Sequence, residues 1–292
     1  MWGALLPIVM GMNSFFRRIV GLVALSLVAG GCSVASSAAP PEPAVVLRVS
    51  GSGSATPIVE QLAAVFTASH PEVSFEFGSG TNTGGGVTGV TEGTLDLAVA
   101  NRPLKPEEAA LGVGYHPFAI DAIVFAVRLP NQVLSVTTDQ VRSLYGGEIT
   151  DWSRFGGDPL PVFLLGRDPD ESAVNLFFEP TMDGQSTAPA MTVLERSSEM
   201  LSALDSTPGS IGFTSLGLLR LSGYDSIAPL TLDGVEPGPA TITDGTYRWV
   251  TSFALVTPPG GASDAAAEFL GFVLSAGARS TLEKYEYAPA AG

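Results

Sequence analysis

The sequence predicts an α/β protein of two lobes, whose first part has the strand and helix order of a doubly wound sheet. Three observations support this prediction. From Val45 onward, short apolar runs alternate with segments of helical periodicity. Glycine-rich turns follow the first two apolar runs, at the sheet edge where open α/β proteins bind ligands. The 292 residues, 45% of them hydrophobic, are enough for two modest cores.

The N-terminus has the pattern of an export signal. From Met12, two arginines precede a short apolar run, and small residues then lead to Cys32. The run is too short to span a bilayer comfortably. We expect residues 1–31 to form a cleaved signal peptide, in which residues 1–11 are consistent with an over-extended translation start. The segment resembles a bacterial lipoprotein signal, which implies acylation of Cys32. Ala29 stands where leucine is usual, so plain secretory cleavage nearby is the alternative.

A tether is expected after the signal. Residues 33–44 hold only small residues, prolines and one acid, a composition that cannot form a packed core. With Cys32 they make a predicted lipidated tether over residues 32–44, and the folded region begins near Val45. The expected protein is exported to the periplasm or cell surface, and it touches the membrane only through its lipid anchor.

Charge and composition exclude several classes of function. The formal net charge is −15, and only Lys105 and Lys284 are lysines, so the chain has no basic stripe for nucleic acid. One cysteine and two histidines supply neither an internal disulfide nor a zinc site. We therefore expect no metal, no cofactor and no nucleic-acid partner.

The elements follow one another in a β-α-β-α-β order at first. The predicted strands are VVLRVS, VSFEFG and LDLAVA, and the predicted helices begin at Pro57 and near Gly84. After Pro117 a second block begins. Its predicted strands are AIVFAV, PVFLLG and SIGFTS, and its predicted helices are TTDQVRSLY, capped by a threonine, and SAVNLFFEP.

The last block holds a strand, WVTSFALVTP, and one long helix over residues 264–285. We expect the end of the chain to return to the first lobe. Lobe 1 is therefore predicted to contain residues 45–118 and 249–292, and lobe 2 residues 119–248.

The first glycine-rich turn, residues 51–56, lies between a buried strand and an amphipathic helix. Backbone N–H groups, the helix dipole and serine hydroxyls meet there, which favours an anion. Thr56 replaces the third glycine of a dinucleotide-binding fingerprint, and no GK[ST] follows for a P-loop. A tight turn without a ligand is the alternative.

The second turn, FGSGTNTGGGV, repeats this arrangement, with a mobile surface loop as its alternative.

The order of motifs resembles the phosphate-binding subunits of bacterial phosphate ABC importers and the type II periplasmic binding proteins around them. The resemblance covers about residues 45–290. The motifs that carry it are GSGSATPIVEQL, GSGTNTGGGV, DLAVANRPL, DAIVFAV, GEITDWSRFGG, PGSIGFTS and FLGFVLSAGARSTLEKYEYAP.

The resemblance implies a fold and a function. The fold is a two-lobed Venus-flytrap, with a mixed β-sheet in each lobe and a hinge between them. The implied protein is a monomeric solute-binding protein without enzyme activity. It captures inorganic phosphate or a similar oxyanion and presents it to an ABC permease in the inner membrane.

The resemblance also implies the ligand contacts of lobe 1. Gly53 and Ser54 belong to the first anion loop, and Thr81 or Thr83 supplies a hydroxyl from the second. Asp96, the first residue of DLAVANR, matches the family's binding aspartate. A carboxylate accepts a hydrogen bond from a protonated oxyanion and repels one without a proton, so Asp96 would favour hydrogen phosphate over sulfate.

In lobe 2, Arg167 matches the arginine that pairs with the anion, because its planar fork can reach two oxygens. Here the sequence departs from the family: Ser172 lies one position later than usual, and Ala173 and Val174 replace Gly-Thr. Nearby acids also allow Arg167 to form only a structural ion pair.

Two other functions remain open. One is a divergent family member that acts as a sensor or surface protein without transport, or that binds a different small anion. The other is a hydrolase that uses Ser54 or Ser172, for which neither His70 nor His116 is a plausible base.

Overall fold

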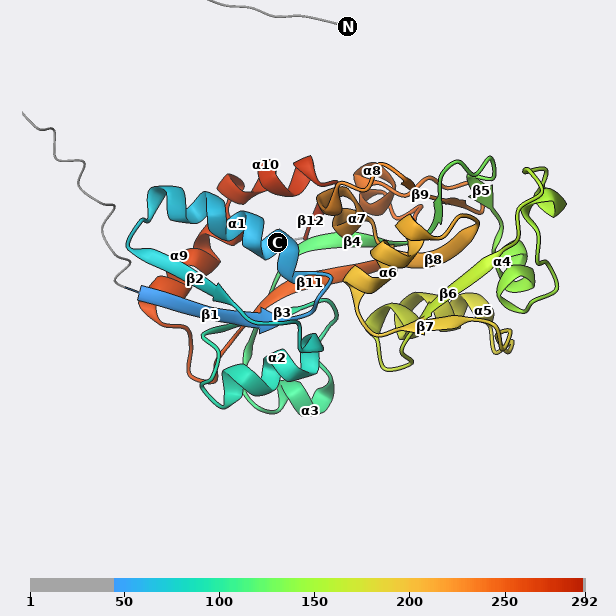
Figure 1. The fold of residues 1–292 in the computed structure, drawn as a ribbon. Coiled ribbons are helices and arrows are strands. Elements are labelled where there is room, and N and C mark those ends of the chain that lie inside the picture. The colour runs from blue at the N-terminus through green and yellow to red at the C-terminus, as the bar shows by residue number, and fades with distance from the viewer. Residues whose placement is uncertain (1–44, 291–292) are drawn as a thin grey trace, which may run out of the picture. The chain divides into compact units, whose positions relative to one another are not determined.

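The structure, a computed structural model, describes residues 45–290 (Figure 1). The predicted signal peptide, the lipidation site Cys32 and the tether lie outside the described residues. Within residues 45–290, no helix is long and apolar enough to cross a membrane.

The first lobe begins with the predicted β-α-β-α-β order. Strands β1 and β3 pair in parallel, as do β1 and β2. Parallel pairing requires a helix between consecutive strands, and two helices supply these connections. The elements are β1 (Val45–Gly51), α1 (Thr56–Ser69), β2 (Val73–Phe77), α2 (Asn82–Thr91), β3 (Leu97–Ala100) and α3 (Pro106–Ala109).

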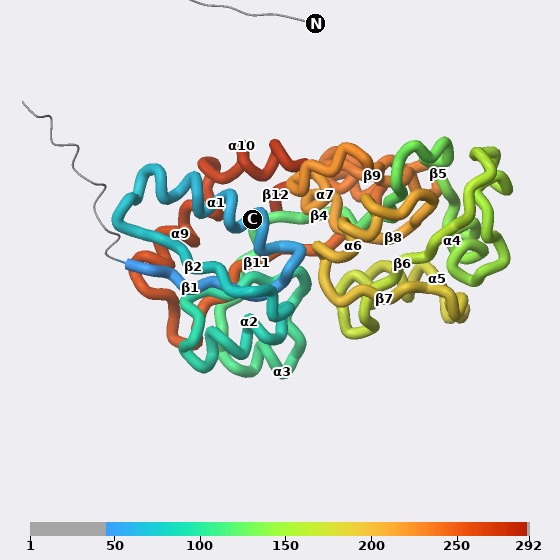
Figure 2. Tube along the Cα trace, viewed as in Figure 1, coloured from blue at the N-terminus to red at the C-terminus, as the bar shows by residue number. Residues whose placement is uncertain are grey.

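Two long strands connect the lobes. β4 (Gly114–Arg128) pairs with β11 (Val250–Thr257) through its first part and with β8 and β9 through its last part. Figure 2 traces both strands running side by side from one lobe to the other. Each lobe has the predicted mixed sheet, and β4 makes the two sheets continuous, in the order β2-β1-β3-β11-β4-β8-β6-β7. The exact division at residues 118/119 and 248/249 stays a prediction, because β4 passes that point without a break.

The second lobe holds the elements between β4 and β11. Helix α4 begins with the predicted threonine cap: the side chain of Thr137 accepts a hydrogen bond from the Gln140 N–H. The elements are β5 (Ser135–Val136), α4 (Thr138–Tyr145), a 3-10 turn (Trp152–Phe155), β6 (Phe163–Arg167), a π-helical turn (Val174–Phe178), α5 (Glu179–Met182), β7 (Thr192–Leu194), α6 (Ser197–Ser206), β8 (Ser210–Ser215), α7 (Leu216–Ser222), β9 (Ile227–Pro229), β10 (Thr231–Leu232) and α8 (Pro239–Thr243).

The C-terminal segment returns to the first lobe as two helices. The single helix predicted over residues 264–285 was wrong: the chain forms α9 (Asp264–Val273) and α10 (Ala276–Lys284), then β12 (Ala288–Pro289). The side chain of Ser275 accepts a hydrogen bond from the Gly277 N–H at 3.1 Å and caps the second helix. The break lets residues from both helices enter one core, in which Val273 and Leu282 are buried.

Each lobe has its own hydrophobic core. In the first lobe, β1, β3 and β11 pack against α1 and α9, with Phe66 and Phe269 in edge contact. The second core contains Trp152, Phe177 and Phe178, which are almost fully buried. Because these aromatic side chains fill the core, they do not serve as ligand platforms.

We expect Gly51→Ala to lower the free energy of unfolding by about 3 kcal/mol. Gly51 has a φ of +148°, and an added Cβ would lie 2.1 Å from the Val99 carbonyl oxygen on the neighbouring strand. Urea titration measures the loss. Gly112→Ala is the matched control, because Gly112 has a φ of +76° and no heavy atom within 4 Å of the added Cβ; it should cost only about 1 kcal/mol. Equal losses in the two variants would contradict the steric explanation.

Candidate functional site

The first glycine-rich turn connects β1 to α1 and is drawn tightly toward β3. Ser52 is buried, and its backbone N–H donates to the Val99 carbonyl at 2.8 Å. The hydroxyls of Ser52 and Ser54 lie 3.1 Å apart. Thr56 closes the turn by donating its hydroxyl to the Ser52 carbonyl at 2.8 Å. The turn is therefore an ordered corner rather than a flexible linker, and Gly53 faces the cleft between the lobes.

The second glycine-rich turn lies directly against the first. The Thr81 N–H donates to the Gly51 carbonyl at 2.9 Å, and the Ser50 hydroxyl donates to the Ser79 carbonyl at 3.0 Å. A Cβ added to Gly80 would lie 3.2 Å from the Gly53 Cα, so this close approach depends on glycine. The predicted meeting of two turns at one edge of parallel strands is confirmed.

The two candidate threonines of the second turn have different positions. Thr83 is buried and lines the cleft, and its hydroxyl donates to the Asn101 side-chain oxygen at 3.0 Å. Thr81 is exposed and is not among the cleft residues. Of the two, only Thr83 brings its hydroxyl to the cleft, where the proton goes to Asn101.

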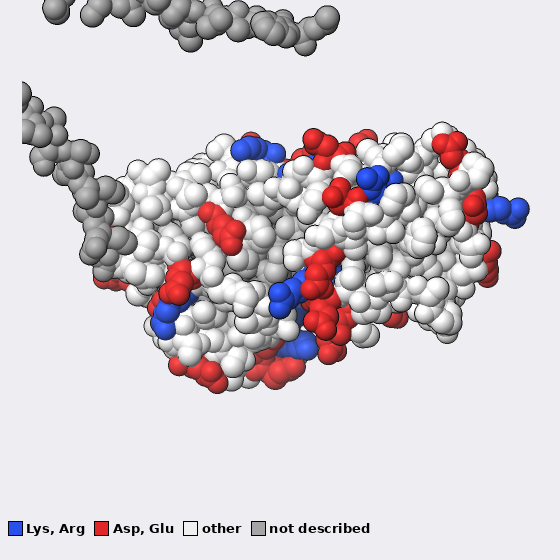
Figure 3. All heavy atoms as spheres, viewed as in Figure 1, with Lys and Arg blue, Asp and Glu red and all other residues white. Residues whose placement is uncertain are grey.

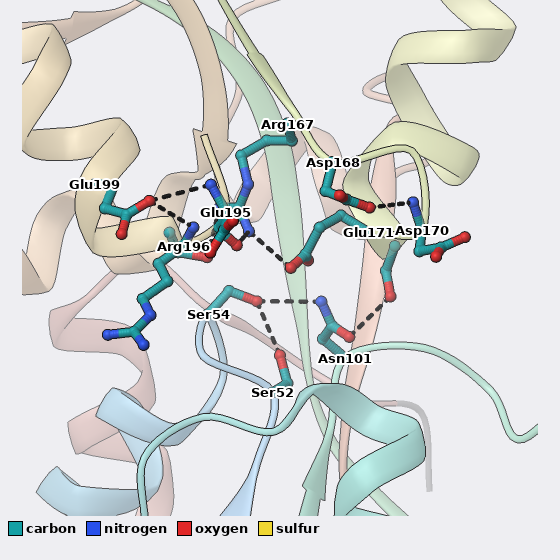
Figure 4. A network of polar contacts seen from close by, with 12 residues as sticks. Ser52, Ser54, Asn101, Arg167, Asp168, Asp170, Glu171, Glu195, Arg196 and Glu199 are labelled. Carbon is teal, nitrogen blue, oxygen red and sulfur yellow. Dashed lines mark hydrogen bonds and ion pairs between the residues drawn. The ribbon is translucent and has the colours of Figure 1, made fainter. Parts of the chain in front are cut away.

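Asn101, which the sequence analysis did not select, lies where these groups meet. It follows β3 directly, is buried and lines the cleft. Figure 4 shows its side chain between the serines of the first turn and the loop after β6. Its amide nitrogen donates to Ser54 Oγ at 3.2 Å, and its side-chain oxygen accepts from Ser172 Oγ at 3.1 Å. One residue therefore joins both lobes.

Asp96 lies at the other end of the same strand, which does not fit its predicted role as a ligand. It precedes β3, whereas ligands bind at the carboxyl ends of parallel strands. Its carboxylate accepts hydrogen bonds from the backbone and side chain of Arg48, at 2.8 and 3.0 Å, and it is not among the cleft residues. Partial burial raises the pKa of Asp96, but the hydrogen bonds from Arg48 outweigh this effect and hold it below its ordinary value.

Arg167 ends β6 and brings the main cation of the second lobe to the cleft. Its guanidinium donates to Ser197 Oγ and to the Glu195 carbonyl, both at 3.0 Å, and it forms an ion pair with Glu171 at 2.8 Å. The side chain is 6% exposed, and its Nε–H is buried without a hydrogen-bond partner. Native structures rarely leave a buried donor unpaired, which makes Arg167 a candidate contact for a bound acceptor.

The predicted residues of the second lobe are brought to the cleft together. Ser172 lines it and reaches Asn101 across the gap, and Arg167 lines it from β6. Gly53 and Thr83 line it from the first lobe, and Ser54 is joined to it through Asn101. The cleft has a volume of about 1450 Å³.

The cleft carries both signs of charge. On the face shown in Figure 3, acidic and basic side chains gather beside one another near the centre. Arg102 is held by Glu108 at 2.7 Å, and the hydrogen bond from Arg102 lowers the pKa of Glu108. The charged side chains that line the cleft are Glu60, Arg102, Lys105, Glu108, Arg167, Asp168, Asp170, Glu171, Glu195 and Arg196. With six acids against four cations, the cleft cannot hold an anion by charge alone, so directed hydrogen bonds must contribute.

The described part of the chain shows no comparable arrangement of side chains for metal binding or for hydrolysis. Residues 45–290 contain no cluster of three or more side chains suited to a metal ion. Both histidines lie away from the cleft: His70 stacks on Phe66, and His116 contacts Thr257. Neither is placed to activate Ser54 or Ser172.

Comparisons with known proteins agree with this architecture. A family model described as the PBP superfamily domain matches residues 38–276. The phosphate-binding protein PstS of Bacillus subtilis (strain 168) is 26% identical over 232 residues, which make up 78% of this chain and 75% of that protein.

Two solved structures share the fold. A substrate-binding protein from Clostridium perfringens, solved with bound phosphate, has a TM-score of 0.74 and 24% identity, over 84% of this chain and 100% of its own. An ABC-type phosphate transport receptor from Vibrio cholerae has a TM-score of 0.62 and 24% identity, over 83% and 99%. The mixed sheets joined by two crossing strands are the type II periplasmic binding fold. The match over most of its length shows that the chain belongs to the PBP superfamily.

Proposed function

We propose that this chain is the substrate-binding protein of an ABC importer and captures phosphate or a related oxyanion between its lobes. The observation that carries the proposal is the buried, unpaired Nε–H of Arg167, in a cleft that Asn101 and the hydroxyls of Thr83 and Ser172 also line. The names of the relatives support phosphate as the ligand, since the Bacillus subtilis protein is called phosphate-binding.

The groups in the cleft suit a small oxyanion. The Arg167 guanidinium and the Asn101 amide can donate hydrogen bonds over a few ångströms, and the acidic surface outside the cleft is screened beyond about 8 Å. The hydroxyl protons of Thr83 and Ser172 go to the Asn101 side-chain oxygen, so these hydroxyls would donate to a ligand only by turning away from Asn101. The charge of Arg167 is itself partly balanced by Glu171 at 2.8 Å. The ligand must therefore compete with this carboxylate for the guanidinium.

The two crossing strands suggest how the cleft opens. We place the hinge where β4 and β11 leave the first lobe, in agreement with lobes divided at residues 118/119 and 248/249. The hydrogen bond between Ser172 and Asn101, at 3.1 Å, is the contact that closure would make. A permease would then receive the ligand when the lobes part.

The proposal includes the expected export and lipid anchor. Cys32 is the modified residue, and residues 33–44 are long enough to hold the folded region away from the membrane. The protein would act as a monomer in the periplasm or at the cell surface, with the permease and the oxyanion as its partners.

One observation favours the alternative, a divergent member that binds a different anion or serves as a sensor. Glu171 already occupies part of the Arg167 guanidinium, and two further acids, Asp168 and Asp170, line the cleft beside it. A ligand that carries its own cationic group would fit this surrounding better than phosphate does.

A melting screen tests the proposed function. We expect phosphate at 100 times its dissociation constant to stabilise the protein by about 2.7 kcal/mol, because only the folded state binds it. Purified residues 45–292 are melted with phosphate, sulfate, arsenate, molybdate and phosphonates, with chloride at equal ionic strength as the control. If none of these anions raises the melting temperature above chloride, the oxyanion proposal is wrong and the sensor alternative is favoured.

A further inference from the structure

One of the closely bound polar side chains in the cleft is a neutral amide. Asn101 is 9% exposed and receives or donates hydrogen bonds with three side chains: Ser54, Thr83 and Ser172. Its backbone carbonyl also accepts from the hydroxyl of Thr251 on β11. The side chain is therefore held in one place by groups from both turns and both lobes, and the backbone of the residue is held by a crossing strand.

The hydrogen bonds determine which way the amide points. Thr83 Oγ1 accepts from the Asn101 backbone N–H at 3.2 Å, so its own proton is free to go to the Asn101 side-chain oxygen. Ser172 donates to the same oxygen at 3.1 Å. Two donors fill the oxygen's two lone pairs, and the amide nitrogen is left to face Ser54. Of its two N–H groups, only one is used there, at 3.2 Å.

We propose that Asn101 is a specificity-determining residue, which lets the cleft bind tetrahedral oxyanions that carry no proton. An amide N–H donates to an ionised oxygen, whereas a carboxylate at this position would need a proton on the ligand to form any hydrogen bond. The ligand class therefore includes fully ionised oxyanions, with sulfate accepted alongside hydrogen phosphate. This inference rests on the proposed function and specifies its substrate class.

Carboxylates that line the cleft, Glu171, Asp168 and Asp170 among them, could also recognise a proton on the ligand. Of these, Glu171 is the one paired with Arg167. The carboxylate of Glu171 is 2.8 Å from the Arg167 guanidinium, which occupies one of its oxygens. Asp96 cannot take this role, because it is bound to Arg48 at the far end of β3. Asn101 is thus the residue whose replacement should change the selectivity.

Calorimetry with phosphate and sulfate at pH 8 tests the proposal. We expect wild type to bind the two anions with affinities within about tenfold of each other. Asn101→Asp should lower sulfate affinity relative to phosphate by at least about a hundredfold, since it places a second negative charge against an anion without a proton.

Two further variants keep the result interpretable. Asp96→Asn is the matched control and should leave the affinity ratio unchanged. Glu171→Gln should also leave the ratio unchanged, and a shift toward sulfate would assign the proton recognition to Glu171 and overturn the proposal. If Asn101→Asp does not fold, the ratio of the phosphate and sulfate affinities of wild type decides whether the proposal stands.

The possible failures are distinct. Wild type that binds phosphate more than a hundredfold better than sulfate would overturn the role of Asn101 and leave the proposed function standing. Wild type that binds neither anion would overturn this inference, and the proposed function falls with it if the other oxyanions of the melting screen do not bind either.

Discussion

Replacement of Arg167 by alanine is expected to lower oxyanion affinity at least about thirtyfold. The guanidinium supplies the main charge of the second lobe to the cleft, and its buried Nε–H has no other acceptor. Loss of a charge-assisted, desolvated hydrogen-bond donor typically costs 2–5 kcal/mol, or roughly 30-fold to several thousandfold in affinity. Without Arg167, the carboxylate of Glu171 would also face the ligand unpaired. Calorimetry with the best anion from the melting screen measures the effect.

Arg142→Ala is the matched control for this experiment. Arg142 also belongs to the second lobe and also bonds a backbone carbonyl and an acid, Thr181 at 2.7 Å and Asp139 at 3.0 Å, but it does not line the cleft. It should cost a similar amount of stability and no affinity. An Arg167→Ala protein that binds as tightly as wild type would remove Arg167 from the site.

The elements of the first lobe could be predicted because their local signals agree with their surroundings. Strand β3 reads as a continuous apolar run, since it is buried on both faces of the sheet, and β1 is an apolar run that is exposed at its start and at Arg48. The long C-terminal helix was predicted wrongly for a physical reason. The helical periodicity continues through Ser275, but a serine followed two residues later by glycine can cap a new helix, and only tertiary packing decides that it does.

The sequence indicated where the candidate site lies, but it did not lead to the selection of Asn101, which lies at the centre. The rule that ligands bind at the carboxyl ends of parallel strands leads to Asn101, which follows LAVA, and away from Asp96, which precedes it. The resemblance to the family pointed to Asp96 instead, as the match to its binding aspartate. Nothing in the sequence indicated its partner, because Arg48 is brought beside it only by the register in which Val49 pairs with Leu97.

Contacts between the lobes could not be predicted either. The hydrogen bond from Ser172 to Asn101 joins residues 71 positions apart, and it depends on how the second lobe is held by β4 and β11. A structural ion pair between Arg167 and a nearby acid was the alternative in the sequence analysis. The sequence did not indicate that Arg167 could pair with Glu171 and also line the cleft. Short-range sequence patterns identify the polar side chains, whereas the crossing strands β4 and β11 decide which of these side chains come into contact.

The free energy of unfolding is expected to depend on pH through Asp121, a fully buried acid on β4 where the strand passes between the lobes. Its carboxylate accepts from the Ser215 hydroxyl and from the Gly217 N–H, the latter at 3.0 Å. Burial raises the pKa of Asp121 from 3.8 to about 7, against the opposing effect of these hydrogen bonds, and the charge of Glu286 adds to the increase. Two tyrosines, Tyr247 and Tyr287, have raised pKa values in the same region because of burial and the charge of Asp121.

The sign of the pH dependence follows from the direction of the pKa shift of Asp121. The folded chain holds the proton more tightly than the unfolded chain, so the contribution to stability is complete below about pH 4 and is lost as the pH rises through about 7. At 1.36 kcal/mol per pKa unit, the loss is on the order of 4 kcal/mol.

Asp121→Asn isolates this contribution, since asparagine keeps the shape and cannot ionise. Urea titrations of both proteins between pH 5 and 8 should show the stability of wild type falling relative to the variant, by roughly 1.4 kcal/mol per pH unit up to about pH 7. Asp151→Asn is the control: Asp151 also accepts from a serine hydroxyl and a backbone N–H, but it is solvent-accessible and hydrogen bonds lower its pKa. Its effect should not vary over this range. A constant difference between wild type and Asp121→Asn would mean that the carboxylate is already ionised at pH 5, and that the strand joining the lobes tolerates a buried charge.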